Sequence, residues 1–258
     1  MSRHDYYPTR DSNDIIYLGD VPELKRINRT DRYLEIGSTV TLDQLLAVGK
    51  QVLPGLLQRT LEQTATKIVR KQMTIGGAIC TPQVRLSLSG TLCALQAEAE
   101  VKTCLGPKTE TRWMDMNRLY DRKGAFQLRK NDLVTRIRLG FERENFSYHM
   151  RAGSPMVNPG ETVMLSFACF HNQGVIDRFR MCITFPESLL LVPHEVDMMM
   201  HGTLLPLTTQ QIERVVRSIM EEIFSSSDHE LPPIQIERSR RFIEAAMHEL
   251  NAQSLSER

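Results

Sequence analysis

The sequence predicts an α+β protein, in which short strands and amphipathic helices alternate along a chain of 258 residues. Apolar residues recur at helical spacing in some segments. In others they alternate with polar residues or form short continuous runs, as strands do. A third observation comes from the C-terminal half, where two apolar runs flank residues 172–174, a hairpin pattern that ends in glycine. Together these patterns indicate helices packed on sheets.

The N-terminal half is expected to open with short elements. Residues 15–18 form an apolar run that predicts a buried strand, stopped by Gly19 and Pro22. Residues 33–37 predict a second strand, and Thr41 begins a helix with leucines at helical spacing. The next helix is opened by Pro54 as a first-turn proline. The further elements expected in this half are a buried helix at 88–95, a strand at 97–102, a turn at 106–107, and a strand at 133–139 whose Arg136 and Arg138 face water.

Between these elements, residues 69–79 read as the tail of a helix that runs into a double-glycine turn. Adjacent glycines let backbone N–H groups approach a ligand closely, because a side chain at Gly76 or Gly77 would block the approach. The alternative is that the pair only lets a helix and a strand pack together, since most such pairs are simply turns.

A change of character at 141–159, rich in glycine and proline, predicts a domain boundary, giving domains 1–142 and 143–258. After the hairpin, residues 209–224 predict a helix that starts with a hydroxyl cap, and 236–250 predict a final helix.

Composition excludes several classes of function. The formal net charge is +1, so no broad field favours nucleic acid, and no apolar run approaches the roughly 20 residues of a membrane helix. The five cysteines form no C-x-x-C pair and the histidines no ligand pattern, so no metal site is expected in this chain. The thiols and the missing secretory signal indicate a cytoplasmic protein.

The order of several segments resembles the FAD-binding (medium) subunit of the molybdenum hydroxylases, the group of xanthine dehydrogenase and carbon monoxide dehydrogenase. The matching segments are 21–24, 34–42, 69–70, 74–77, 92–101 and 133–137. The resemblance implies a truncated PCMH-type FAD-binding domain followed by a smaller α+β domain with a three-stranded antiparallel sheet. The family's first glycine loop, an Ala-Gly-Gly segment, is absent, so the chain is expected to begin after it.

The resemblance also implies the cofactor site. Its second glycine loop matches Thr74, Ile75, Gly76, Gly77 and Ala78, whose amides would donate to phosphate oxygens as a backbone nest does. Further flavin-lining positions are Thr64, Ser87 and Val134. Ala78 and Ser87 stand where the family usually has asparagine and aspartate, which removes two polar anchors and weakens FAD binding. No catalytic acid or base is expected.

The resemblance implies an electron-transfer subunit of an oxidoreductase. Electrons from [2Fe–2S] clusters in an iron–sulfur subunit would pass through FAD to NAD or another acceptor, after oxidation of a substrate in a molybdenum-binding subunit. One alternative is a degenerate subunit that holds these partners together without binding flavin. Another is a stand-alone enzyme of a different flavin family, disfavoured because the C-terminal half shows no substrate-site pattern.

Overall fold

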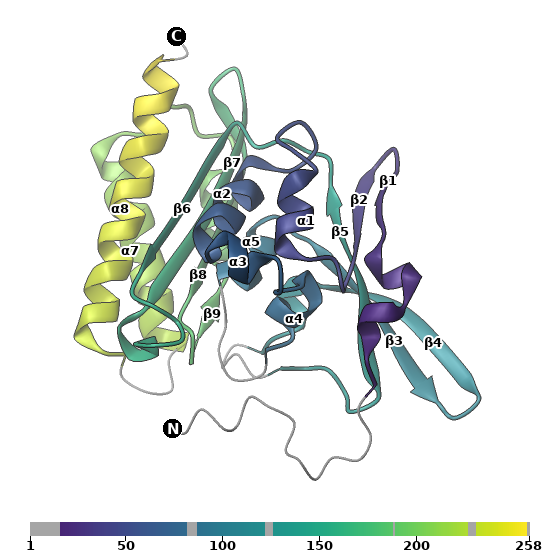
Figure 1. Ribbon diagram of the computed structural model, residues 1–258. Coiled ribbons are helices and arrows are strands. Elements are labelled where there is room, and N and C mark those ends of the chain that lie inside the picture. Colours follow the sequence, from purple (N-terminus) through teal and green to yellow (C-terminus); the bar gives the residue numbers. More distant parts are fainter. Residues whose placement is uncertain (1–15, 82–86, 122–125, 188, 227–230, 257–258) are drawn as a thin grey trace.

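The α+β class is confirmed by the computed structural model, which describes residues 16–81, 87–121, 126–187, 189–226 and 231–256 (Figure 1). In this part of the chain the first sheet has five antiparallel strands in the order β1-β2-β5-β3-β4. Their bounds are Ile27–Arg29 (β1), Tyr33–Gly37 (β2), Glu98–Leu105 (β3), Lys108–Asp115 (β4) and Asp132–Gly140 (β5). Strands β3 and β4 form a hairpin that projects from the body of the molecule (Figure 1).

Helices cover one face of this sheet. They are α1 (Leu42–Ala47), α2 (Gly55–Thr64), α3 (Lys67–Arg70), α4 (Ile75–Ile79) and α5 (Ser87–Ala94). Alternate strand residues such as Ile36, Val101 and Ile137 face these helices and are fully buried. Helix α1 begins where the sequence predicts, because Thr41 and Gln44 form a reciprocal capping box.

The second sheet pairs β6 (Phe146–Ala152), β7 (Val163–Asn172), β8 (Val175–Thr184) and β9 (Leu190–Leu191) in that order. The predicted hairpin is confirmed: β7 and β8 are joined by Gln173 and Gly174, both with positive φ. The resemblance implied three strands, and the two residues of β9 add a fourth. Strand β6 lies in the segment predicted to be irregular, where local glycine and proline signals outweighed its alternating pattern.

Both faces of the second sheet are buried, which explains the nearly continuous apolar run of β7. On one face lie α6 (His194–Met200), α7 (Thr209–Ser226) and α8 (Pro233–Ser256), packed on residues such as Phe167 and Phe179. Ala168, Phe170 and Cys182 face the other way, into the core that α2 and α5 share with the first sheet. Helices α2 and α5 therefore lie between the two sheets (Figure 1).

The strand predicted at residues 15–18 is wrong where the structure describes it, from residue 16 on, and Ile15 lies outside the described residues. Residues 16–17 are not a buried strand: the side chains of Ile16 and Tyr17 are 83% and 74% exposed, and Leu18–Asp20 is a 3-10 helix. The turn preferences of Gly19 and Pro22 prevail over the apolar run. Helix α7 does start with a hydroxyl cap, which is Thr208, since the Gln211 amide donates to the Thr208 hydroxyl at 3.3 Å.

No helix in the described ranges is long and apolar enough to cross a membrane. The boundary predicted at residue 142 stays a prediction, although it falls between the last strand of one sheet and the first strand of the other.

Candidate functional site

The two adjacent glycines lie in the short helix α4 rather than in an open turn. Thr74 caps this helix, and its hydroxyl group accepts a hydrogen bond from the Gly77 amide at 3.1 Å. The Ala78 amide donates to the Thr74 carbonyl at 2.9 Å. The sequence pattern Thr-x-x-Gly therefore closes a helical turn at this point.

Helix α4 is fixed to the first sheet through the segment that follows β2. The amides of Ile75 and Gly76 donate to the carbonyls of Val40 and Ser38, at 2.9 and 2.8 Å. The Ser38 amide donates in turn to the Thr135 carbonyl of β5 at 2.9 Å. This ladder places the glycines beside the N-terminal end of β5, where Val134 lies.

Gly76 and Gly77 have different roles. A Cβ atom at Gly76 would lie 2.7 Å from both the Cβ and the carbonyl oxygen of Ser38, so glycine is needed there for backbone packing. A Cβ atom at Gly77 would meet one close neighbour, the Thr74 hydroxyl at 3.0 Å, and Gly77 is exposed. The close-packing alternative thus explains Gly76, whereas Gly77 presents bare backbone to an open space.

That open space is a cavity of about 1010 Å³, lined by α4, by the segments before β1 and after β2, and by the start of β5 with the segment before it. Four cationic side chains lie around it: Lys25, Lys71, Arg129 and Lys130. None of the four forms an ion pair with a residue that the structure describes. The cavity is therefore suited to an anionic ligand.

Asp132, which also lines the cavity, does not offset this charge. Its side chain is fully buried and ion-paired with Arg112 at 2.6 Å. Burial would raise the pKa of Asp132, but hydrogen bonds from Arg112, Thr103 and the Arg129 amide lower it to about 2. The Asp132 carboxylate thus links β5 to β3 and β4 through these hydrogen bonds.

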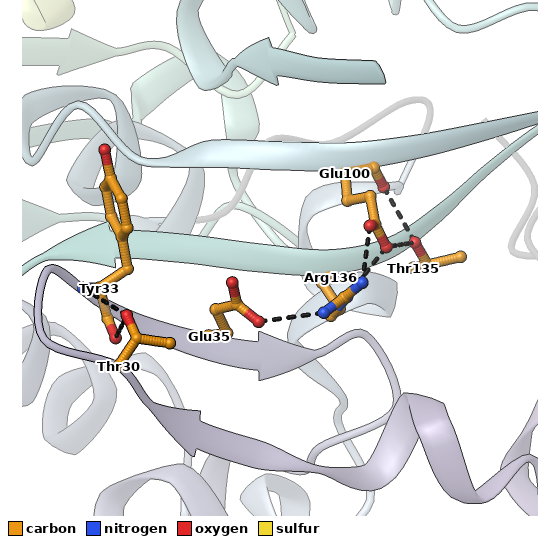
Figure 2. Close-up of polar contacts among 6 residues, drawn as sticks. All are labelled: Thr30, Tyr33, Glu35, Glu100, Thr135 and Arg136. Atoms are coloured by element: carbon orange, nitrogen blue, oxygen red, sulfur yellow. Dashed lines mark hydrogen bonds and ion pairs between the residues drawn. The ribbon is translucent and has the colours of Figure 1, made fainter. Parts of the chain in front are cut away.

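A second ion-pair group holds β5 between its neighbours (Figure 2). Arg136 bridges Glu35 of β2 at 3.0 Å and Glu100 of β3 at 2.8 Å, and the Thr135 hydroxyl donates to Glu100 at 2.5 Å. Although Glu100 is buried, these contacts lower the pKa of its carboxyl group. Arg136 and Arg138 were predicted to face water, but both are partly buried and ion-paired, Arg138 with Glu98.

The structure brings together half of the predicted cofactor residues. Thr74, Gly76, Gly77 and Val134 line the cavity. Ile75 and Ala78 belong to the core beneath it, with 0% and 3% exposure.

The other two predicted residues do not line the cavity. Thr64 ends α2 and donates its hydroxyl to the Thr60 carbonyl. Ser87 is buried at the start of α5, where its hydroxyl contacts the Met164 sulfur at 3.1 Å.

Sequence reasoning missed the cationic lining of the cavity. Lys71 stands three residues before Thr74, so its closeness to the glycines was visible in the sequence. Lys25, Arg129 and Lys130 come from distant segments, and no local signal marks them. They meet the glycines only because β2 and β5 pair in register.

A family model described as the FAD binding domain in molybdopterin dehydrogenase matches residues 7–140. No curated protein matches the chain in a sequence search. Among solved structures, quinoline 2-oxidoreductase from Pseudomonas putida 86 is 14% identical, with a TM-score of 0.70 over 92% of this chain and 80% of that chain.

Reconstituted CO dehydrogenase from Oligotropha carboxidovorans is 15% identical, with a TM-score of 0.71 over 92% of this chain and 80% of that one. A carbon monoxide dehydrogenase from Hydrogenophaga pseudoflava, which lacks the Mo-pyranopterin moiety of its cofactor, is 14% identical. Its TM-score is 0.71 over 88% of this chain and 78% of that one. At these identities the likeness shows the shared fold.

Proposed function

Because the chain belongs to the family of FAD-binding domains of molybdopterin dehydrogenases, we propose that it is the flavin subunit of a molybdenum hydroxylase-type oxidoreductase. In this proposal FAD occupies the cavity beside Gly77 and Val134. The observation that carries it is the cavity itself, which is open to bare backbone at Gly77 and has four cationic side chains around it.

The described residues fit FAD in volume and in charge. About 1010 Å³ is at the upper end of the range for ligand pockets, as a dinucleotide needs. The amides of Ile75, Gly76, Gly77 and Ala78 all donate within the protein, so they do not form the phosphate nest expected from the sequence. The charge of the pyrophosphate would instead be met by side chains such as Lys71 and Arg129.

When bound, FAD supplies the redox chemistry, while the protein orients it and excludes competing reactions. The molybdenum-binding subunit would pass electrons to [2Fe–2S] clusters in an iron–sulfur subunit. Those clusters would reduce the FAD, which would pass the electrons to NAD or another acceptor. Support for such partners comes from the solved neighbours, which include a CO dehydrogenase described as Cu,Mo-containing.

The backbone amides of α4 already donate hydrogen bonds within the protein, so they are not free to bind phosphate. This favours a second candidate, a degenerate subunit that holds the same partners together without flavin. The two candidates differ in one measurable property, the retention of oxidised flavin by the purified chain.

The test is to incubate the purified chain with FAD, remove the excess, and record the visible flavin absorbance. Riboflavin, which has no phosphate, serves as the matched ligand. The electron-transfer proposal predicts retained FAD, weaker retention of riboflavin, bleaching by anaerobic dithionite, and recovery when NAD or another oxidant is added. If the chain retains no flavin, either alone or with its partner subunits, the electron-transfer proposal is wrong. The second candidate, a subunit that holds the partners together without flavin, then takes its place.

A further inference from the structure

A second cavity, of about 800 Å³, lies at the opposite end of β5 from the first. It is lined by Leu139 and Gly140 of β5 and by Arg178 and Arg180 of β8, so it lies where the two sheets approach each other. Val134 and Gly140 are six residues apart on one strand, a distance of about 20 Å. The cavity is therefore separate from the proposed flavin site.

Two guanidinium groups on the same face of β8 share one aromatic partner. The Cζ atoms of Arg178 and Arg180 lie 4.4 and 5.5 Å from the centre of the Phe170 ring. Arg178 is neutralised, because it is ion-paired with Glu142 and, at 3.0 Å, with Asp177. Burial and the neighbouring charge of Arg178 lower the pKa of Arg180.

Arg180 has no direct partner of this kind among the described residues, although the charges of Asp197, Glu142 and Asp177 act on it from a distance. Its guanidinium group forms no hydrogen bond or ion pair with any of them, and its Nε atom is buried without a partner. A half-buried cation with unused donors is costly to a fold. A ligand that accepts hydrogen bonds and carries negative charge would remove this cost.

The acidic side chains around this cavity already have cationic partners. Glu98 is paired with Arg138 at 2.5 Å, and Asp115 with Arg118 at 3.5 Å. Glu142 is the carboxylate paired with Arg178. None of the described carboxylates that line this cavity therefore forms an ion pair with Arg180.

A second unsatisfied polar group lies nearby. The Oδ1 atom of Asn117 is buried without a hydrogen-bond partner. Asn117 and Arg180 both line the cavity, and both also line a small hollow of about 10 Å³ beside it. An amide that lacks a partner beside an unpaired guanidinium group is the arrangement of a polar ligand site.

We propose that this second cavity is an anion-binding site, in which Arg180 holds the phosphate or carboxylate group of a small molecule. The planar guanidinium fork matches both groups. The charge of Arg178 is already balanced by Glu142 and Asp177, so Arg180 is the cation that meets the ligand. The Oδ1 atom of Asn117 is an acceptor, so it would contact a protonated oxygen of the ligand. The proposal does not depend on flavin binding at the other cavity.

The test is calorimetric titration of the intact chain with two probes, inorganic phosphate and malonate, with sodium chloride at matched ionic strength as reference. We expect saturable binding of at least one probe, and the stronger probe identifies the preferred group. Arg180→Met keeps the aliphatic stem over Phe170 and should weaken binding by about tenfold or more. The exposed Arg214→Met of α7 is the matched control and should bind as the wild type does.

Urea unfolding of the ligand-free protein distinguishes a role of Arg180 in ligand binding from a role in holding the fold together. An unpaired guanidinium group predicts that Arg180→Met unfolds at the same urea concentration as the wild type or at a higher one. If that variant does not fold, Arg180→Lys, which keeps the charge but not the fork, should show weakened binding. Absence of saturable binding in the wild type, or equal binding by the Arg180 variants, would overturn the proposal.

Discussion

Gly76 and Gly77 show how one sequence feature can serve two purposes. The backbone of Gly76 lies against Ser38, which leaves no room for a Cβ atom, whereas Gly77 borders the cavity. The first glycine is therefore required by packing and the second is available to a ligand. A motif assigned wholly to the cofactor would miss this division.

The division predicts different stabilities for two neighbouring alanine variants. Gly76→Ala should lower the free energy of unfolding by about 1–3 kcal/mol, because the Ser38 backbone cannot yield easily. Gly77→Ala should change it by less than about 1 kcal/mol, since only the Thr74 hydroxyl must shift and alanine favours a helix. Urea denaturation of both variants gives the comparison, and equal losses would contradict the assignment.

Single residues were predictable where local sequence decides their place. The start of a helix at Thr41 followed from a short-range pattern, and Thr41 caps α1. Thr64 and Ser87 do not line the cavity, because their positions depend on how α2 and α5 pack between the sheets. The sequence contains no local signal for that packing.

At the scale of elements, a buried chain of hydrogen bonds links the central helices to the second sheet. The hydroxyl of Thr60 in α2 contacts that of Thr91 in α5 at 2.7 Å, and Thr91 contacts Ser166 of β7 at 2.8 Å. Ser166 lies 3.2 Å from Nδ1 of His149 in β6, whose Nε2 is buried without a partner. Burial, with a smaller effect from the charge of Arg151, lowers the pKa of His149 to about 4.

Because the pKa of His149 is lowered in the folded protein, we expect the free energy of unfolding to fall in mild acid. Below its ordinary value of 6.5 the unfolded chain binds a proton that the native His149 refuses, so stability falls as the pH drops from 6.5 towards 4. The loss should reach about 3 kcal/mol. His149→Gln should show a flatter profile in urea denaturation across this range, while the exposed His248→Gln should follow the wild type. Identical profiles for all three proteins would show that His149 does not carry the effect.

Elements were predictable where period and caps agree, as in α1, α5, α7 and the β7–β8 hairpin. The strand predicted at 15–18 is not formed at residues 16–18, because a short apolar run has no period and the neighbouring turn residues decide its conformation. Strand β6 was missed for the converse reason, since glycine and proline on its C-terminal side suggested a loop. Its pairing with β7 is a long-range property.

At the scale of the whole molecule, the fold is shared with quinoline 2-oxidoreductase and CO dehydrogenase at only 14–15% identity. In this chain the ladder of amide hydrogen bonds from Gly76 to Ser38 to Thr135 places the glycines of α4 beside the start of β5. In this chain the cavity at that point is surrounded by cationic side chains, while the α4 amides are engaged within the protein. The central claim is that FAD binds there.

The measurement that tests this claim most directly is an equilibrium titration of flavin fluorescence with three proteins: the wild type, Gly77→Val and Gly160→Val. A valine side chain at Gly77 enters the cavity, whereas Gly160 has open space around it and does not line the cavity. We predict one FAD bound per wild-type chain, affinity about tenfold or more weaker for Gly77→Val, and unchanged affinity for Gly160→Val. Equal affinities for all three proteins, or no binding by the wild type, would contradict the account.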